Sequence, residues 1–290
     1  MKKVLFDTDI GSDIDDALAL AYLLREKECE LVGITTVSGE PIKRAMLASA
    51  ICRAAGRDDI PIYPGMEGPY VGKQIQSQAP QAEKLPNWEH KTDFPECEAI
   101  SFMRRVIREN PGEITLLAVG PMTNVATLFA TDPELPSMLE SLVLMCGDFE
   151  EGTERNEWNS KADYASTVKV YSTPVKLHRS FGLNVTLKLT LPREEVDQSL
   201  YGDIMAPVKD FSHKWFEMGP DKMIFHDPLA AVAVFHPEVC TYAKGKASIS
   251  IDAPKRGYST FCENPDGFHE IAVEVDRDRF FEIYLNTVNS

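Results

Sequence analysis

The sequence predicts an α/β protein whose mostly parallel sheet is covered by helices on both faces. Apolar runs with strand character alternate with helical patterns from end to end of the chain, which is typical of such a sheet. One of these runs, Ile114–Val119, is apolar almost throughout, as strands buried on both faces are. Because no linker, repeat or low-complexity tract interrupts the 290 residues, we expect a single domain, 1–290.

The first part of the chain holds the expected start of the sheet. A short apolar run predicts a strand at Val4–Phe6, and a helical pattern follows over Ala17–Leu24. Cys29–Val37 is rich in β-branched and apolar residues, which favours a central strand. A helix over Ile42–Ala55 is closed by a glycine, and Ile60–Tyr63 predicts one more short strand.

The next segment, Pro64–Pro95, is rich in Gly, Pro, Gln and Lys and has little periodicity. A loop of this length in a compact domain is usually functional, often a lid, and the alternative is a disordered insertion. Helical patterns follow at Glu96–Asn110 and Val125–Ala130. The apolar runs Ile114–Val119 and Ser141–Met145 predict strands buried in the sheet.

The second half of the chain repeats this alternation with shorter elements. A polar loop at Gly147–Ser160 follows a strand, and a strongly apolar helix at Leu229–Phe235 follows His226-Asp227-Pro228. The remaining expected elements are a helix at Ala162–Ser172, a strand at Val175–His178, helical stretches within Pro192–Gly219, strands at Lys246–Ile251 and Glu270–Val275, and a closing helix at Arg277–Leu285.

The composition excludes several classes of partner. A net charge of −15 and a pI near 4.9 argue against nucleic-acid backbones and anionic membranes. No apolar run approaches membrane-spanning length, and the N-terminus turns acidic before a signal-type apolar stretch develops. The six cysteines are scattered and form no CxxC pair, as expected of buried thiols in a reducing compartment. We therefore expect a cytoplasmic protein.

Five carboxylates crowd the junction between the first strand and the first helix. A helix N-terminus favours one or two acids, but five repel one another, and a bound cation would remove that repulsion. Oxygen ligands favour a hard ion, Ca²⁺ or Mg²⁺, and the alternative is a solvated acidic helix start. Neighbouring helical side chains point in different directions, so one acid of the Asp15-Asp16 pair could hold the ion while the other faces a substrate. The five are Asp7, Asp9, Asp13, Asp15 and Asp16.

Other polar groups follow strands that should end at the same edge of the sheet. Asp227 could add a carboxylate to the ligands of the ion, and His226 could serve as a proton donor. Asp227 could instead be a plain helix N-cap. Glu157 and Asn159 would point the same way in extended backbone and could bind two sugar hydroxyls, and the alternative is a solvated loop. The turn after Val119 frees its carbonyl as an oxygen ligand.

Together these motifs resemble the inosine–uridine-type nucleoside hydrolases. The matching stretches follow the family order from residue 4 to residue 235, and the first and last of them are the specific ones. They are Asp7-Thr8-Asp9 with Asp15-Asp16-Ala17, Ile34-Thr35-Thr36-Val37, Gly120-Pro121-Met122-Thr123-Asn124, Leu142-Val143-Leu144-Met145, Glu157-Trp158-Asn159 and His226-Asp227-Pro228.

The resemblance implies a Rossmann-like sheet, a single Ca²⁺, and hydrolysis of the N-glycosidic bond of a ribonucleoside or close analogue to free base and ribose. It also implies a small-molecule nucleoside as partner and a homo-oligomer, either a dimer or a tetramer. The ion would be held by Asp9, Asp16, the carbonyl of Val119 and Asp227.

The resemblance further assigns residues to the substrate. Asp9 would take a proton from the attacking water, and His226 would protonate the leaving base. Asp7 would support the site from behind. The residues implied at the ribose are Asp15, Glu157 and Asn159 at its hydroxyls, Met145 against the sugar, and Asn184 near the 5′ end.

The chain departs from the family pattern at several places. The acidic motif DTDIGSDIDD is longer by two residues than the usual form, so an alternative register would place Asp13 rather than Asp15 at the ribose. Glu40 stands where the family usually has an asparagine, and we expect this carboxylate at the substrate, as an acceptor only when ionised. Thr153 falls where another asparagine is expected, and Met66–Trp88 lacks a central histidine.

Two other functions compete with this interpretation. Asp7-Thr8-Asp9 after a strand resembles the start of a haloacid-dehalogenase-type phosphatase, in which Asp7 would be the nucleophile and Mg²⁺ the ion. The chain could also be a nucleoside- or sugar-binding protein that keeps the fold without turnover, an alternative supported by Glu40 and the altered loop.

Overall fold

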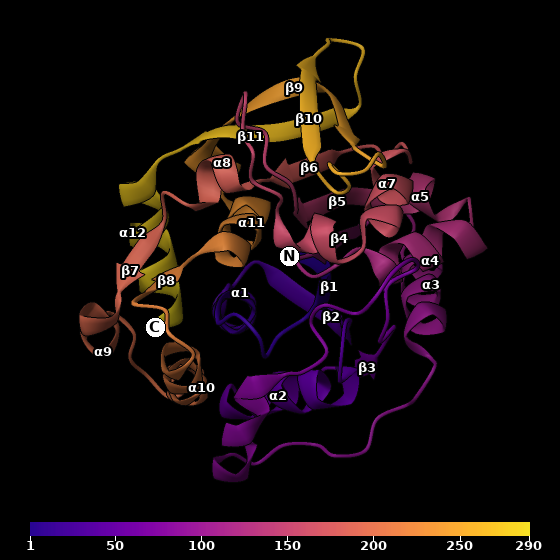
Figure 1. Cartoon of the computed structure of the whole chain (residues 1–290). Coiled ribbons are helices and arrows are strands. Elements are labelled where there is room, and N and C mark those ends of the chain that lie inside the picture. Colours follow the sequence, from indigo (N-terminus) through magenta and orange to yellow (C-terminus); the bar gives the residue numbers. More distant parts are fainter.

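The computed structural model describes residues 1–290, and its main sheet has nine strands. Their spatial order is β10-β9-β11-β6-β5-β4-β1-β2-β3, with β10 at one edge and β3 at the other (Figure 1). The strand bounds are β1 (Lys2–Thr8), β2 (Cys29–Thr36), β3 (Ile62–Pro64), β4 (Ile114–Ala118), β5 (Leu139–Met145), β6 (His178–Phe181), β9 (Cys240–Ile249), β10 (Ser259–Glu263) and β11 (His269–Val275).

From β11 to β3 all neighbouring strands run parallel, whereas β9 pairs antiparallel with both β11 and β10. This arrangement confirms the predicted mostly parallel sheet. The chain leaves β1 toward β2 and β3 on one side, and places β4, β5 and β6 on the other side. The strand order therefore reverses beside β1, and α/β proteins bind ligands at the carboxyl ends of strands around such a point.

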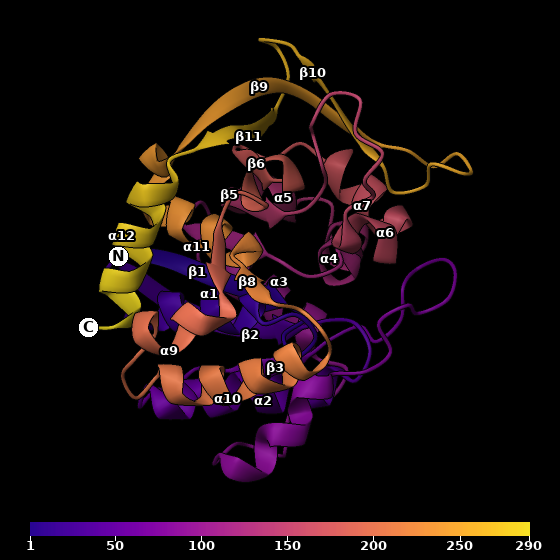
Figure 2. The ribbon, with the colours of Figure 1, turned by 60° about the vertical axis from the view of Figure 1, so that its left-hand side comes forward.

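Helices cover both faces of the sheet, as predicted (Figures 1 and 2). The α-helix bounds are α1 (Asp15–Arg25), α2 (Pro41–Ala54), α3 (Ala99–Glu109), α4 (Thr123–Thr131), α5 (Leu135–Met138), α6 (Trp158–Ala162), α7 (Tyr164–Tyr171), α8 (Leu183–Thr186), α9 (Val196–Ser199), α10 (Met205–Glu217), α11 (His226–Phe235) and α12 (Arg277–Val288). The short 3₁₀ helices are η1 (Pro80–Asn87), η2 (Arg193–Glu195) and η3 (Pro237–Val239).

The central strands send alternate side chains into two hydrophobic cores. In β1, Val4 and Phe6 pack with α1, α11 and α12, whereas Leu5 packs with the core that contains α3 and α4. In β5, Val143 packs in the same core as Val4 and Phe6, and Leu144 packs in the same core as Leu5. Successive residues of a strand point to opposite faces, so an apolar run without alternation is the pattern of a sheet buried on both sides.

A second, two-stranded antiparallel sheet joins β7 (Thr190–Pro192) to β8 (Lys222–Ile224). These strands lie on either side of α9 and α10 in the sequence and bring the chain back to the start of α11. Helix α10 packs against η1 and α2 in both ribbon views. No helix combines the length and the apolar character that crossing a membrane requires.

The sequence expectations about local structure fail at several places. The strand expected at Val175–His178 is β6, His178–Phe181, because its polar residues pair with β5 and β11 inside the sheet. The exposed strand β10 was missed because its side chains show no apolar run. Asp227 is not a helix N-cap, since α11 already begins at His226 and Phe225 occupies the cap position.

Candidate functional site

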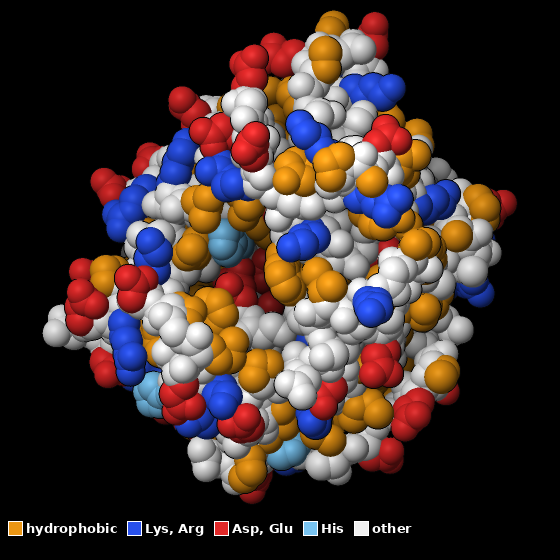
Figure 3. Space-filling view, viewed as in Figure 1, with side chains coloured by type: hydrophobic (Ala, Val, Ile, Leu, Met, Phe, Trp, Pro, Cys, Tyr) orange, Lys and Arg blue, Asp and Glu red, His pale blue; other side chains and the backbone are white.

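The sheet carries a cavity of about 520 Å³ at the carboxyl ends of β1, β4 and β5. In the space-filling view it is a hollow near the middle of the face, with acidic side chains on its floor and a histidine at its rim (Figure 3). No lysine or arginine lines it. Its carboxylates belong to Asp9, Asp13, Asp15, Asp16, Glu157 and Asp227.

Three of these acids form a tight cluster. Asp15 and Asp16 lie in the first turn of α1, Asp227 lies in the first turn of α11, and one oxygen of each lies within 4.8 Å of the others. Burial raises the pKa of all three carboxyls, and repulsion from neighbouring carboxylates in the cavity raises it further. A cation would favour their charged forms, and an oxygen-only ligand set suits a hard metal ion.

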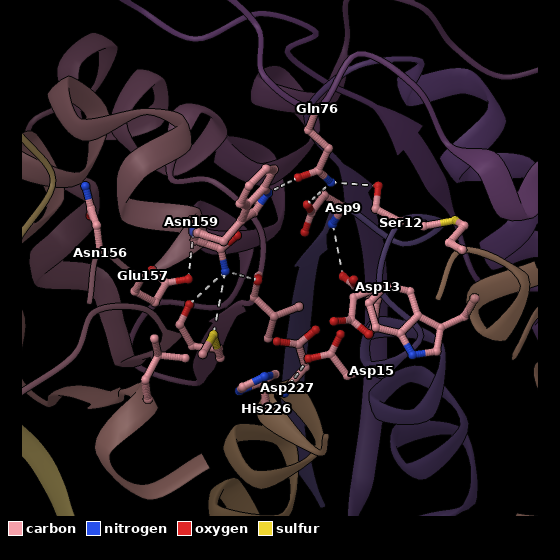
Figure 4. Close-up of a pocket in the computed structure, with 17 residues that line it drawn as sticks. Asp9, Ser12, Asp13, Asp15, Gln76, Asn156, Glu157, Asn159, His226 and Asp227 are labelled. Atoms are coloured by element: carbon pink, nitrogen blue, oxygen red, sulfur yellow. Dashed lines mark hydrogen bonds between the residues drawn. The ribbon is translucent and has the colours of Figure 1, made fainter. Parts of the chain in front are cut away.

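The end of β1 is tied to the start of α1. Asp16 Oδ1 accepts hydrogen bonds from the Thr8 hydroxyl and, over 3.1 Å, from the backbone N–H of Asp9. Asp9 lines the cavity but is not part of the three-carboxylate cluster, and its Oδ2 accepts a hydrogen bond from the Gln76 amide (Figure 4). Burial is the main cause that raises the pKa of Asp9.

The first acid of the motif lies behind the cavity. Asp7 Oδ1 accepts hydrogen bonds from the Thr35 hydroxyl at 2.6 Å and the Asn124 amide at 2.7 Å, and burial raises its pKa to about 7. It does not line the cavity. Asp13 does, and its Oδ1 accepts a hydrogen bond from the next backbone N–H, that of Ile14. Of the two registers considered, only Asp15 belongs to the three-carboxylate cluster.

Glu157 and Asn159 both line the cavity, but not from a continuous extended strand. Glu157 caps α6, and its carboxylate accepts hydrogen bonds from the backbone N–H groups of Gly147, Asn159 and Ser160. The Asn159 amide donates to the carbonyl of Val119 at 2.6 Å and to that of Met145 at 3.1 Å. The carbonyl expected to bind the ion is thus hydrogen-bonded to Asn159.

His226 lines the cavity beside Asp227 (Figure 4). Its Nδ1 lies 2.7 Å from the Thr186 hydroxyl, and Nε2 has no hydrogen-bond partner within the chain. Burial lowers the pKa of His226 to about 4, so its imidazole is neutral at pH 7. A neutral imidazole still carries one N–H donor.

Two predicted substrate contacts lie outside this cavity. Glu40 precedes α2, pairs with Lys43 at 2.6 Å, and accepts a hydrogen bond from the backbone N–H of Ala79 at 2.9 Å. Asn184 donates to the carbonyl of Ala272 and lines a neighbouring hollow of about 420 Å³. Met145, the remaining predicted substrate contact, does line the cavity.

Sequence reasoning missed several side chains that line the cavity. Gln76 comes from the long segment after β3, where no periodicity indicates which residues face inward. Its amide oxygen accepts a hydrogen bond from the Trp158 indole N–H. The other missed lining residues are Ser12, Asn156, Trp158, Leu183, Trp215 and Met218.

Comparison with known proteins gives a consistent result. A family model described as "Inosine-uridine preferring nucleoside hydrolase" matches residues 4–282. The chain is 26% identical over 281 residues to "Probable uridine nucleosidase 2" of Oryza sativa subsp. japonica, covering 89% of this chain and 81% of that protein. It is 29% identical over 260 residues to "Pyrimidine-specific ribonucleoside hydrolase RihA" of Photobacterium profundum, covering 82% and 81%.

Solved structures share the fold. The plant nucleoside hydrolase PpNRh1 superposes with a TM-score of 0.85 at 23% identity, over 100% of this chain and 99% of that one. The purine-preferring ribonucleoside hydrolase from Gardnerella vaginalis superposes with a TM-score of 0.84 at 23% identity, over 99% and 98%.

Proposed function

Because the chain belongs to the family of inosine-uridine preferring nucleoside hydrolases, we propose that its cavity holds one Ca²⁺ and one ribonucleoside side by side. The chain is a glycosidase that hydrolyses N-glycosyl compounds, and ribonucleosides are the substrates that family membership supports. The products are the free base and ribose. This membership overturns the phosphatase interpretation, in which Asp7 would have been the nucleophile.

The observation that carries the Ca²⁺ proposal is the cluster of Asp15, Asp16 and Asp227 in a cavity that no lysine or arginine lines. Asp16 and Asp227 belong both to this cluster and to the ligand set implied by the sequence. We propose that Asp9 and the carbonyl of Val119, which line the same cavity, complete the protein ligands. Ca²⁺ is a hard ion that binds oxygen ligands and accepts irregular coordination geometry.

The substrate proposal follows from the groups that remain available. Asp15 would accept from a ribose hydroxyl. The Asn159 side-chain N–H₂ already donates to two carbonyls, so its Oδ1 remains as an acceptor for a second hydroxyl. Glu157 is fixed by three backbone donors and can still accept at its remaining lone pairs. Met145 would pack against the sugar.

The chemistry suits an acidic cavity. Breaking an N-glycosidic bond places positive charge on the ribose, and fixed carboxylates stabilise that charge where it develops. A bound Ca²⁺ would supply charge that fixes the ribose hydroxyls and makes water a better proton donor. Asp9 would accept the proton of the attacking water. His226 in its protonated form would donate the Nε2 proton to the departing base and return to the neutral imidazole.

The test is release of free ribose from a panel of purine and pyrimidine nucleosides by purified protein with Ca²⁺. We expect turnover of at least one nucleoside, and loss of turnover and of Ca²⁺ binding together in Asp9→Ala. Tight nucleoside binding by the wild type without ribose release would instead identify a binding protein.

A further inference from the structure

Beneath the acidic segment lies a buried arginine that the mechanism does not use. Arg44, in the first turns of α2, is 0% exposed and is the largest side chain buried to this extent. Its guanidinium has hydrogen-bond partners on all three nitrogens. The acceptors are the carbonyls of Gly39 (2.8 Å), Asp9, Ile10 (3.1 Å) and Gln78 (3.1 Å), together with the Ser12 hydroxyl (3.1 Å).

These acceptors belong to three separate segments of the chain. Asp9, Ile10 and Ser12 belong to the acidic segment, Gly39 to the turn before α2, and Gln78 to the long segment after β3. A guanidinium offers five donors in a rigid planar fork, so it can hold several carbonyls in fixed directions. Arg44 therefore joins the three segments at one point.

Ser12 extends this junction to the side chain of Asp9. Its hydroxyl accepts from Arg44 and, over 2.8 Å, from the Gln76 amide, and it donates to the carbonyl of Gln78 at 3.4 Å. The same Gln76 nitrogen donates to Asp9 Oδ2 (Figure 4). Arg44 thus holds Asp9 from both ends, directly at its carbonyl and through Ser12 and Gln76 at its carboxylate.

The turn that approaches Arg44 has an unusual backbone. Ser38 and Glu40 have φ angles of 76° and 59°, in the left-handed region that residues with a side chain rarely adopt. A Cβ on Gly39 between them would lie 2.5 Å from the backbone of Gln76 and Ser77. Such conformations persist where surrounding contacts hold them, and the bond from Arg44 to the Gly39 carbonyl is one such contact.

Arg44 also supplies charge. No lysine or arginine lines the cavity, and the Arg44 guanidinium lies against the carbonyls of Asp9 and Ile10. This positive charge is part of the chain and is present whether or not a cation is bound. A lysine would keep the charge but not the planar fork.

We propose that Arg44 is a positioning residue for the hydrolase reaction. It fixes the positions of Asp9 and of the Gln76 segment, and these positions determine the affinity for the cation and the rate of turnover. It does so without touching the substrate. The proposal rests on the function proposed above. It also explains the acidic motif that is longer by two residues, since Ser12 lies in that extended motif and joins Arg44 to Gln76.

The test compares Arg44→Lys with Arg53→Lys, a matched change at an exposed site on the same helix. Full-length protein is titrated with Ca²⁺ by calorimetry and assayed with the nucleoside that the wild type hydrolyses fastest. Loss of several charge-assisted hydrogen bonds predicts about a tenfold weaker Ca²⁺ affinity and about a tenfold lower kcat in Arg44→Lys, with KM changed less than about threefold. Arg53→Lys should match the wild type.

Ser12→Ala keeps the charge and the buried guanidinium, so it tests the same connection if Arg44→Lys does not fold. We expect a kcat about threefold to tenfold lower with an unchanged melting temperature, as for loss of the shared hydrogen bonds. A lower melting temperature with kcat and Ca²⁺ affinity equal to those of Arg53→Lys would make Arg44 purely structural and overturn the proposal.

The outcomes also separate this proposal from the function on which it rests. If the wild type hydrolyses no nucleoside, the proposed function fails, and the Ca²⁺ affinities alone decide the role of Arg44. If the wild type also binds no Ca²⁺, both proposals fail.

Discussion

The backbone N–H of Asp227 donates a hydrogen bond to Oδ2 of Asp15 over 3.3 Å. This bond joins the first turn of α1 to the first turn of α11, two helices that also pack against each other. Helix N-termini carry partial positive charge, so two of them stabilise the carboxylates that meet between them. The bond therefore joins acids from distant parts of the sequence in one cluster.

Removal of divalent cations with EDTA is expected to lower the melting temperature more at pH 8 than at pH 5. Without a cation, the pKa of Asp13 is raised to about 7, and those of Asp15, Asp16 and Asp227 are raised too. A carboxyl whose pKa is raised in the folded state contributes a stabilisation that is fully present below the ordinary pKa of 3.8. That stabilisation is lost as the pH rises through the folded-state pKa. Thermal unfolding with EDTA or Ca²⁺ at both pH values measures this difference. Equal shifts at the two pH values would argue against a cation at these acids.

Glu40→Gln is expected to change kcat/KM by less than about threefold, as for a substitution away from the site. Glu40 lies outside the cavity, and glutamine can still accept the hydrogen bond from Ala79. Steady-state kinetics of this variant measure the effect. A large rise in KM would restore the substrate contact that the sequence predicts for Glu40.

Glu157→Gln is expected to lower both stability and activity. The carboxylate accepts from three backbone N–H groups, and a glutamine side chain would turn an N–H₂ group toward one of them. An unsatisfied buried donor costs about 1–3 kcal/mol. Urea unfolding measures the free energy, and ribose release measures the activity. Full stability in this variant would mean that the three hydrogen bonds do not hold the loop.

His226→Ala is expected to slow natural nucleosides by about 100-fold or more, the usual contribution of a general acid. A riboside with an activated leaving group, such as p-nitrophenolate, needs no protonation and should be slowed much less. The ratio of the two kcat/KM values measures the acid role separately from binding. Equal slowing of both substrates would remove that role from His226.

His178→Phe is expected to make stability less dependent on pH. His178 is 0% exposed, neither ring nitrogen has a partner, and burial lowers its pKa to about 3. Between about pH 6.5 and pH 3 only the unfolded chain protonates this residue, so stability falls with pH by up to about 1.4 kcal/mol per unit. In urea unfolding at pH 7, 6 and 5, the free energy of unfolding of the variant should therefore fall less with decreasing pH than that of the wild type. A change at the exposed His213 provides the control, and identical slopes for His178→Phe would contradict the expectation.

Sequence reasoning located the acids because their positions follow from strand and helix ends. Asp9 directly follows β1 and Asp16 lies in the first turn of α1, and parallel strands bring such ends to one edge of a sheet. Gln76 could not be found in this way, because its position depends on hydrogen bonds from remote segments rather than on local periodicity. Glu40 was wrongly expected at the substrate. It does follow a strand, but its left-handed backbone conformation could not be predicted from its position in the sequence.

The boundary of β6 shows the same limit for the fold. His178, Arg179 and Ser180 have no apolar pattern of their own, and they form a strand because β5 and β11 pair with them on both sides. Propensity is a weak guide wherever neighbours far along the chain supply the hydrogen bonds.

The cluster formed by Asp15, Asp16 and Asp227 has a consequence for biosynthesis. A ribosome makes β1 and α1 early, but the third carboxylate arrives only when α11 has been translated. Nascent chains and truncated products that stop before α11 carry the first two acids without the third. We therefore expect unfinished polypeptides to consume no nucleoside, so that hydrolysis begins only with the nearly complete chain.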